Sequence, residues 1–250
     1  AQRSDHLDRG DPIRLVQALP PRQKVLITGG TGFIGARLVE ALVSAGHDVT
    51  VLTRNLRNAD ALAHPVRLIT DLSTIHATDR FDAIVNLAGD PVANGPWTAR
   101  KRARIVNSRV DMTRALDDLI ARLQVKPCVF ISGSAVGYYG LHEDAQLTED
   151  AAPRPAFVHD VCREWEESAA VIERHGVRLV TLRIGLVLGV DGGMLARLLT
   201  PFEFGLGGVM GDGNLPDPVL VAFVNDTPLS AAENESAGLA AEAATIACVN

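Results

Sequence analysis

Short apolar runs alternate with longer amphipathic stretches from residue 24 onward. Six runs are rich in valine, isoleucine and leucine: "KVLIT", "DVTVLT", "VRLIT", "FDAIVNLAG", "CVFISGS" and "VRLVTLR". Near-continuous apolar strands that are separated by helices are typical of a parallel sheet covered on both faces. The pattern therefore predicts the α/β class, with a Rossmann-type, doubly wound parallel sheet.

The stretches between these runs have the spacing of amphipathic helices. After the first run, Ile34, Leu38 and Leu42 recur on one helical face. The longest helix is expected over residues 97–123, and the next over residues 157–175. No repeat of fixed period is present, so solenoids and propellers are excluded.

The regular pattern covers the middle of the chain. Residues 1–22 are polar and contain two adjacent prolines, which is typical of an arm or linker. After about residue 213 the alternation of strands and helices stops, and small residues dominate. We expect a nucleotide-binding Rossmann domain over residues 23–213 and an atypical tail, or truncated substrate lobe, over residues 214–250.

Three glycines directly follow the first predicted strand. Gly29 permits a tight turn, Gly32 lets the backbone approach a pyrophosphate, and Gly35 lets the helix pack closely against the strand. Free N–H groups at the start of the helix supply an anion site. The loop lacks the Gly-Lys-Ser/Thr ending of ATP-hydrolysing loops. The preceding strand, the following helix and the second strand favour a dinucleotide site over a glycine-rich turn without a ligand.

The end of the second strand indicates which dinucleotide binds. An acidic residue there would bond the ribose hydroxyls of NAD, but this chain has Arg54, with Arg57 nearby. A charge-assisted bond to a 2′-phosphate contributes roughly 1.5–3 kcal/mol, which is about a tenfold to more than a hundredfold preference. We therefore expect NADP rather than NAD; the alternative is that Arg54 is an ordinary surface arginine.

Composition excludes several other classes of protein. The chain has 250 residues, is 47% hydrophobic and carries a formal charge of −6, which disfavours nucleic acid and anionic membranes as partners. The basic run at residues 99–104 is better explained as a solvated helix face. No apolar run is long enough to span a membrane. Three widely spaced cysteines fit a reducing compartment, so we expect the cytoplasm.

Several motifs in order carry a family resemblance. "TGGTGFIG", "DL" at residues 71–72, "NLAG" at 86–89 and "SGSAVGYYG" at 132–140 resemble the extended short-chain dehydrogenase/reductase superfamily. "NLAGDPV", "CREWE" and "LRIGLVLG" resemble its branch of epimerase family proteins. The resemblance implies that residues 71–72 lie near the adenine and that residues 86–89 line the middle of the coenzyme. Together with the loop and the arginines, the predicted coenzyme-binding residues are Thr28, Gly29, Gly32, Phe33, Ile34, Gly35, Arg54, Asp71, Leu72, Asn86, Leu87, Ala88, Gly89 and Arg183.

The resemblance places Ser134 at the family's catalytic serine but shows no proton donor. The superfamily uses a tyrosine whose pKa is lowered by a lysine four residues later. By order and spacing, this pair would fall at Val161 and Trp165, which cannot perform that chemistry. Tyr138, tuned by His142, is the candidate substitute; the alternative is that its ring packs against the coenzyme.

Two function hypotheses follow. The first is an NADP-dependent oxidoreductase or epimerase that acts on a nucleotide-sugar-like or small carbonyl substrate. The second is an NADP-binding sensor or assembly protein without catalysis, which the missing tyrosine and lysine favour.

The remaining candidate residues have simpler explanations. Arg183 is expected to face substrate or coenzyme, or else to cap a loop. No metal-ligand pattern is present, and Cys162 with His159 is better explained as a core thiol beside a polar group than as a nucleophile. The two long helices are expected to pair across a two-fold axis in a homodimer.

Overall fold

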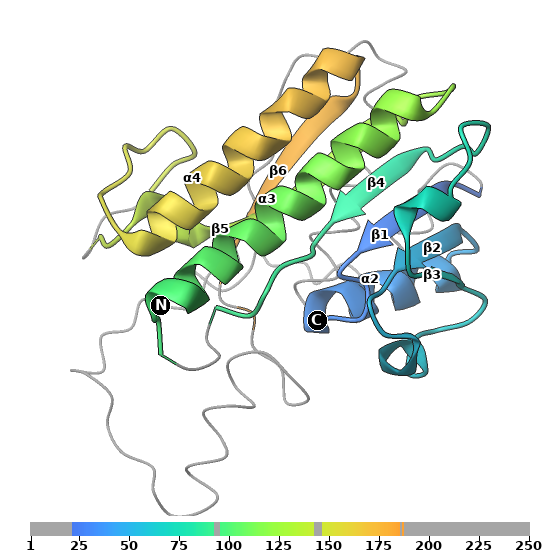
Figure 1. Ribbon diagram of the computed structural model, residues 1–250, viewed down its shortest axis with the longest axis horizontal. Coiled ribbons are helices and arrows are strands. Elements are labelled where there is room, and N and C mark those ends of the chain that lie inside the picture. The colour runs from blue at the N-terminus through green and yellow to red at the C-terminus, as the bar shows by residue number, and fades with distance from the viewer. Residues whose placement is uncertain (1–21, 93–95, 143–146, 186, 188–250) are drawn as a thin grey trace, which may run out of the picture.

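A parallel sheet forms the centre of the molecule. The computed structural model describes residues 22–92, 96–142, 147–185 and 187 (Figure 1). Within these residues the sheet has six strands in the order β3-β2-β1-β4-β5-β6. Their bounds are β1 (Lys24–Thr28), β2 (Asp48–Leu52), β3 (Arg67–Ile69), β4 (Ala83–Asn86), β5 (Val129–Ala135) and β6 (Arg178–Ile184). The predicted doubly wound Rossmann-type sheet is confirmed.

Helices connect the strands. They are α2 (Phe33–Ser44), α3 (Ala99–Arg122) and α4 (Phe157–Ala170), with short 3-10 turns η1 (Leu56–Ala59), η2 (Leu72–Thr74), η3 (Val136–Tyr139) and η4 (Val171–His175). Helix α3 begins two residues later than predicted, because Thr98 caps it by accepting a hydrogen bond from the backbone N–H of Lys101. Helix α4 ends before the predicted position 175, and η4 completes the segment up to Gly176, whose φ is 72°.

Alternate residues of each strand face opposite layers, as the period of two requires. Val25 and Ile27 of β1 pack in the layer that contains Leu38 and Leu42 of α2. Leu26 packs in the opposite layer, with apolar residues of α3 and η4. In Figure 1, α3 and α4 lie side by side over the half of the sheet that contains β4, β5 and β6. Burial of both sheet faces explains why the strand sequences are apolar throughout.

The sheet topology brings distant segments to one edge. Chain order runs outward from β1 to β3 and then returns to β4 on the other side of β1. In the register of the sheet, Thr28 pairs with Asn86, and Asn86 pairs with Ser132. The carboxyl ends of β1, β4 and β5 therefore meet where the strand order reverses, the place at which open α/β sheets bind ligands.

Some predictions concern parts of the chain that the structure does not describe. The predicted arm over residues 1–22, apart from Arg22, and the predicted tail over residues 214–250 lie outside the described residues. The described residues contain no helix that is both long and apolar enough to cross a membrane.

Candidate functional site

The glycine loop fits tightly between β1 and β4. Gly29 has φ 71°, and a Cβ there would lie 2.5 Å from the carbonyl oxygen of Leu87. A Cβ on Gly35 would lie 2.2 Å from the carbonyl oxygen of Gly29. Gly32 is less confined, since its Cβ would meet only that same oxygen, at 3.1 Å. Packing thus requires the first and third glycines. The middle glycine has no side chain that would keep a ligand away from the backbone of the loop.

The start of α2 offers amide groups to a ligand. Gly32 is the N-cap residue and has no side chain to bond the first turn. Among the described residues, no main-chain acceptor is found for the N–H groups of Phe33, Ile34 and Gly35. The first turn also contains no acidic side chain that would repel an anion. Unused amides and the positive end of the helix dipole give this end of α2 the features that a phosphate group requires.

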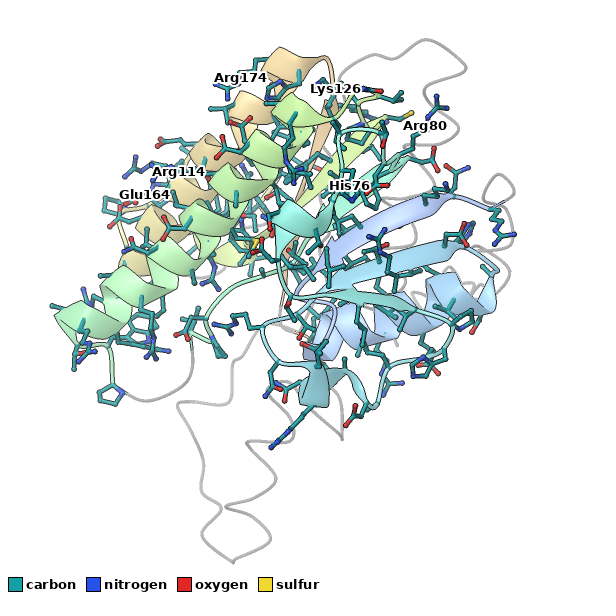
Figure 2. The ribbon with its side chains drawn as sticks, turned by 45° about the vertical axis from the view of Figure 1, so that its right-hand side comes forward. His76, Arg80, Arg114, Lys126, Glu164 and Arg174 are labelled. Atoms are coloured by element: carbon teal, nitrogen blue, oxygen red, sulfur yellow. The ribbon has the colours of Figure 1, made fainter. Side chains whose placement is uncertain are left out.

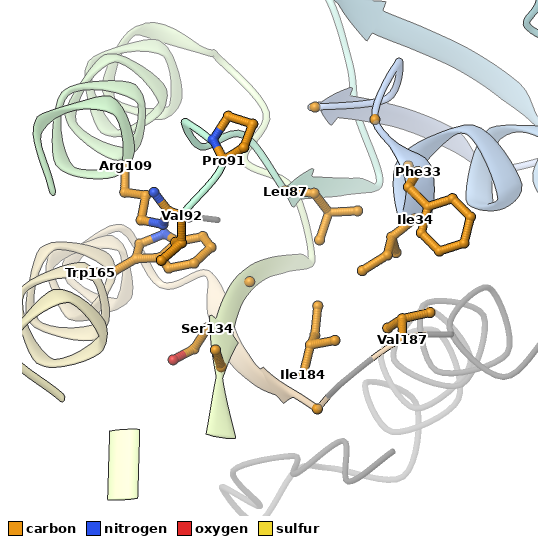
Figure 3. A pocket seen from close by; sticks show the side chains of 16 residues that line it. Phe33, Ile34, Leu87, Pro91, Val92, Arg109, Ser134, Trp165, Ile184 and Val187 are labelled. Atoms are coloured by element: carbon orange, nitrogen blue, oxygen red, sulfur yellow. The ribbon is translucent and has the colours of Figure 1, made fainter. Parts of the chain in front are cut away.

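A cavity of about 500 Å³ extends from this helix end across the carboxyl edge of the sheet (Figure 3). In this view Phe33 and Ile34 lie on one side, Arg109 and Trp165 lie on the opposite side, and Ser134 and Ile184 lie between them. Its other lining residues are Gly29, Gly32, Gly35, Leu87, Pro91, Val92, Arg109, Gly133, Ala135, Trp165, Gly185 and Val187. The cavity therefore joins a phosphate site to a compartment with polar side chains.

Ser134 is fixed by a carboxylate. Only 3% of Ser134 is exposed, and its hydroxyl donates to Oε1 of Glu166 at 2.6 Å. Both oxygens of Glu166 also accept from Arg183, each at 2.9 Å. A carboxylate paired with a guanidinium only accepts hydrogen bonds, so the proton between Ser134 and Glu166 belongs to the serine. The lone pairs of the Ser134 oxygen remain available to a ligand.

Arg183 lies within β6, at the end next to the cavity. Besides Glu166, its guanidinium donates to the Tyr139 hydroxyl at 2.9 Å and to the Glu149 carbonyl at 3.0 Å. Its Cζ lies 3.5 Å from the centre of the Tyr138 ring. Arg183 is not among the residues that line the cavity. In this structure it orients Glu166 and the two tyrosines, and the predicted contact with the coenzyme stays a prediction.

The two tyrosines have different surroundings. Tyr139 is buried, whereas Tyr138 is half-buried and packs edge-on against His159 at 5.4 Å between ring centres. The His142 ring contacts the carbonyl oxygen of Tyr139 at 3.1 Å, not the hydroxyl of Tyr138. The structure therefore shows no contact through which His142 could tune the proton donation of Tyr138. Tyr138 also does not line the cavity, so its role as proton donor stays a prediction.

The positions expected for the tyrosine and lysine of the superfamily lie on α4. Val161 is buried, and Trp165 lines the cavity. The neighbouring Cys162 donates weakly to the carbonyl of Ala135 at 3.6 Å, and burial raises the pKa of its thiol. A buried neutral thiol is inert, in agreement with the interpretation of Cys162 as a core residue.

Thr28 and Asn86 serve the fold of the site. The Thr28 hydroxyl donates to Oδ1 of Asn86 at 2.7 Å, and Nδ2 of Asn86 donates to the Thr113 hydroxyl of α3 at 3.0 Å. All three side chains are completely buried. They hold β1, β4 and α3 together beneath the cavity, while Leu87 lines it. Ala88 and Gly89 follow at the same edge, next to the loop and to Arg109.

The remaining predicted coenzyme contacts lie near the ends of β2 and β3. Arg54 is exposed, and no hydrogen bond or ion pair of its side chain is found among the described residues. Asp71 caps η2 by accepting from the Ser73 N–H at 2.7 Å, a bond that holds the pKa of its carboxyl below the usual value. The carbonyl of Leu72 accepts from Arg122. These residues do not line the cavity itself.

Sequence reasoning missed three side chains of the site. Glu166 bonds Ser134, and Arg109 and Trp165 form one wall of the cavity. Trp165 was noticed only as a replacement for lysine, and Glu166 is its neighbour in "CREWE". Arg109 stands in the middle of a charged helix, where no local pattern separates it from solvent-exposed arginines.

Comparison with known proteins agrees with this geometry. A sequence profile of the NAD dependent epimerase/dehydratase family matches residues 25–212. The chain belongs to this family. The same range contains the glycine loop, Ser134 and, apart from Lys24, the whole described sheet.

Similar family members come from several kingdoms. The chain is 37% identical over 196 residues to the epimerase family protein SDR39U1 homolog, chloroplastic, of Arabidopsis thaliana. The aligned region covers 76% of this chain but only 56% of the plant protein. The crystal structure of human epimerase family protein SDR39U1 with NADPH has 31% identity and a TM-score of 0.65, and covers 76% of this chain and 63% of that one.

A bacterial structure gives a similar match. The nucleoside-diphosphate sugar epimerase from Corynebacterium glutamicum has 32% identity and a TM-score of 0.64, over 81% of this chain and 42% of that one. This epimerase/dehydratase family chain thus spans 56% of the plant relative and less than half of the bacterial protein. The comparison establishes the family and the fold of the shared part.

Proposed function

We propose that this chain binds NADP(H) and acts as an oxidoreductase or epimerase on a nucleotide-sugar-like or small carbonyl substrate. One observation carries the proposal: a single cavity joins the open amides of α2 to Ser134. The coenzyme diphosphate would bind at the start of α2, and the nicotinamide would extend past Leu87 toward Ser134. The related human structure contains NADPH, which supports this choice of coenzyme.

Arg54 is the residue that would select the phosphorylated coenzyme. It follows β2 directly, at the edge of the sheet where the adenosine ribose would lie, and its guanidinium is exposed. A 2′-phosphate bound there would form a charge-assisted pair, which NAD lacks. The proposed preference for NADP over NAD therefore depends on Arg54, whose side chain is exposed in the protein without coenzyme.

Calorimetry on Arg54→Gln tests the proposed coenzyme. We expect the NADPH affinity to fall about tenfold to a hundredfold, while the weaker NADH affinity changes little. The control is Arg80→Gln, since Arg80 is an exposed arginine that precedes β4, at the opposite edge of the sheet (Figure 2). Absence of binding of either coenzyme to folded wild-type protein would refute the coenzyme site.

Ser134 and Glu166 are the proposed acid–base pair. Because the Ser134 proton is donated to Glu166, the serine oxygen can accept a proton from a substrate hydroxyl and pass its own to the carboxylate. The hydride would move between the substrate carbon and the nicotinamide, which supplies that chemistry when bound. In the reverse direction, the same two groups return a proton to a substrate carbonyl oxygen.

A panel of sugar nucleotides and small carbonyls, assayed by NADPH oxidation, tests for catalysis. Where turnover is found, Ser134→Ala and Glu166→Gln should each reduce kcat about a hundredfold or more. Glu167→Gln is the matched control, because that carboxylate is exposed and pairs only with Arg163 among the described residues. Equal activity of Ser134→Ala and wild type would exclude the proposed pair.

A second function is favoured by Val161 and Trp165. These side chains replace the ionisable pair of the superfamily, and both are buried. A protein that binds NADP(H) as a sensor or assembly factor would need the coenzyme cavity but no proton donor. NADPH binding without oxidation of NADPH by any member of the panel would favour this function.

We also propose a cytoplasmic location, which rests on the cysteine content of the chain. One relative in Arabidopsis thaliana is described as chloroplastic. Fractionation of the source cell, with detection of this chain by a specific antibody, distinguishes the cytoplasm from an organelle.

A further inference from the structure

Arg109 is a buried cation at the wall of the cavity. Only 9% of it is exposed, although arginine is almost never buried without a partner. Its Nη1 donates to the carbonyl oxygens of Ile105 at 2.8 Å and Asp90 at 3.2 Å. Among the described residues no carboxylate forms an ion pair with Arg109, and its Nε has no hydrogen-bond partner. The described residues therefore supply no carboxylate that pairs with its positive charge.

The nearby acidic groups are occupied by other cations. Asp90 pairs with Lys101 and with Arg104, and these pairs hold the pKa of its carboxyl low. Glu166 pairs with Arg183. The remaining acidic group nearby, the Cys162 thiol, stays neutral because burial raises its pKa. This end of the cavity thus carries an excess of positive charge in a desolvated setting, and burial lowers the pKa of Arg109 itself.

Trp165 adds a second unused donor at the same wall. The Cζ of Arg109 lies 4.9 Å from the centre of the Trp165 ring, and Figure 3 shows the two side chains stacked on one side of the cavity. The indole Nε1 is buried and has no hydrogen-bond partner among the described residues. An indole N–H can only donate, as can a guanidinium. The Trp165 Nε1 and the Arg109 Nε are enclosed, so the donor that Arg109 can offer to a ligand in the cavity is its Nη2, for which no hydrogen bond is found among the described residues.

Two glycines make room for this pair. A Cβ on Gly89 would lie 2.8 Å from the Arg109 Cζ, and a Cβ on Gly133 would lie 2.9 Å from the Trp165 ring. The stacked donors thus occupy space that any larger residue at either position would fill. This fit argues for a built site rather than for an accidental contact.

We propose that Arg109, stacked on Trp165, forms the anion-binding end of the cavity and holds the carboxylate or phosphate group of a second small molecule beside the coenzyme. The proposal rests on the proposed function, because it assigns the class of substrate: an anionic alcohol or carbonyl compound. The coenzyme diphosphate has its own donors, the amides at the start of α2. Ser134 lines the same cavity and can meet the reacting oxygen of a molecule held in this way.

The indole N–H signal of Trp165 in an NMR spectrum of the ¹⁵N-labelled protein is the readout. The chain has 2 tryptophans, so Trp165→Phe assigns the signal and Trp97 serves as internal reference. Inorganic phosphate and pyruvate are titrated into the NADP⁺-loaded and the coenzyme-free protein. We expect both anions to shift the Trp165 signal, and Arg109→Gln to weaken their binding about tenfold or more. Arg114→Gln, an exposed arginine on the same helix, should leave it unchanged.

The outcomes separate this proposal from the coenzyme site. If Arg109→Gln lowers NADP⁺ affinity as strongly as anion affinity, Arg109 serves the coenzyme and the proposal is overturned. If the anions leave the Trp165 signal unshifted, or shift it equally in Arg109→Gln, no such site exists. If NADP⁺ fails to bind while phosphate and pyruvate still shift Trp165 in an Arg109-dependent way, the coenzyme assignment fails and the anion site stands. Retention of the folded state by Arg109→Gln is checked from its dispersed amide spectrum.

Discussion

Gly35 illustrates how a single missing side chain controls the site. Its Cα lies at the first turn of α2, where a Cβ would come within 2.2 Å of the Gly29 carbonyl oxygen and 2.7 Å of the Gly30 Cα. Both neighbours are backbone atoms, so they cannot move without opening the loop. Any side chain at position 35 must therefore displace the helix start from β1.

Gly35→Ala is expected to lose NADPH binding and about 1–3 kcal/mol of unfolding free energy. Gly46→Ala is the control: its φ of 84° strains an alanine by about 1–2 kcal/mol, but no atom lies within 4 Å of the added Cβ. That variant should keep its coenzyme affinity. Calorimetry with NADPH and urea unfolding measure both effects, and equal affinities for the two variants would contradict the prediction.

His47 makes the stability depend on pH. It is buried at the start of β2, where its Nδ1 accepts from the Gln23 N–H at 3.0 Å. Burial lowers its pKa below 6.5, while the adjacent Asp48 opposes the shift. The unfolded chain therefore takes up this proton more readily than the folded chain does. The contribution of His47 is fully present above the unfolded pKa and declines as the pH falls toward the folded pKa.

Between about pH 7.5 and about pH 5.5, we expect the unfolding free energy of wild type to fall, and part of this fall to be absent in His47→Asn. Asparagine retains an acceptor for Gln23 but does not titrate. His76→Asn, at an exposed position shown in Figure 2, should keep the wild-type slope. Urea unfolding across this range measures the slopes, and identical slopes for wild type and His47→Asn would show that His47 is not responsible.

At the level of elements, α3 connects the site to the rest of the fold. Near its start, Lys101 bonds Asp90 and the carbonyl of Pro91, so it holds the segment that lines the cavity. In its middle it carries Arg109, and near its end Asp117 accepts from Arg174 and His175 of η4. One helix therefore fixes the cavity wall and the end of α4 together.

Asp117→Asn is expected to cost about 1–3 kcal/mol of unfolding free energy, because it removes the charge of a buried carboxylate that accepts from the exposed Arg174 and the partly buried His175. Asp111→Asn on the same helix should cost less than about 0.5 kcal/mol, since its pair with Arg114 is exposed and 3.9 Å long. Urea unfolding compares the two variants. Similar losses would mean that the contact between α3 and η4 contributes little.

At the scale of the whole molecule, the exposed charges of α3 concern the proposed homodimer. Arg100, Arg102 and Arg104 are exposed near its start, whereas exposed charges of both signs follow toward its end: Asp111, Arg114, Asp118 and Arg122. Two copies of α3 that run antiparallel across a two-fold axis would place the basic start of one against Asp111 and Asp118 of the other. We therefore keep the homodimer as a proposal, with α3 and α4 as its interface.

Light scattering at micromolar concentration should give twice the chain mass of 26.6 kDa. High salt should shift the equilibrium toward monomer, because screening weakens exposed charge pairs. Arg104→Glu should weaken the dimer, while Arg67→Glu, at an exposed position on the edge strand β3, should not. A single species of monomer mass at low salt would contradict the proposal.

The sequence by itself predicted the parts of this protein that depend on local order. Apolar runs such as "KVLIT" and "CVFISGS" gave the strands, because a sheet buried on both faces requires apolar residues at every position. The glycine spacing predicted the loop. The tight turn, the approach of a pyrophosphate to the backbone and the packing of the helix on the strand each require a glycine at a fixed position after the strand. Ser134 was found through motif order, and the structure places it at the cavity.

Only the tertiary structure decided how distant side chains combine. Glu166 becomes the partner of Ser134 because α4 crosses the end of β5, and Arg109 meets Trp165 because α3 and α4 lie side by side. The local sequence predicts neither contact, because it does not distinguish a charged helix residue that faces solvent from one that faces a cavity. Burial and charge pairing depend on the whole fold. The fold therefore determines whether Arg109 is a surface residue or an unpaired cation at the wall of the cavity.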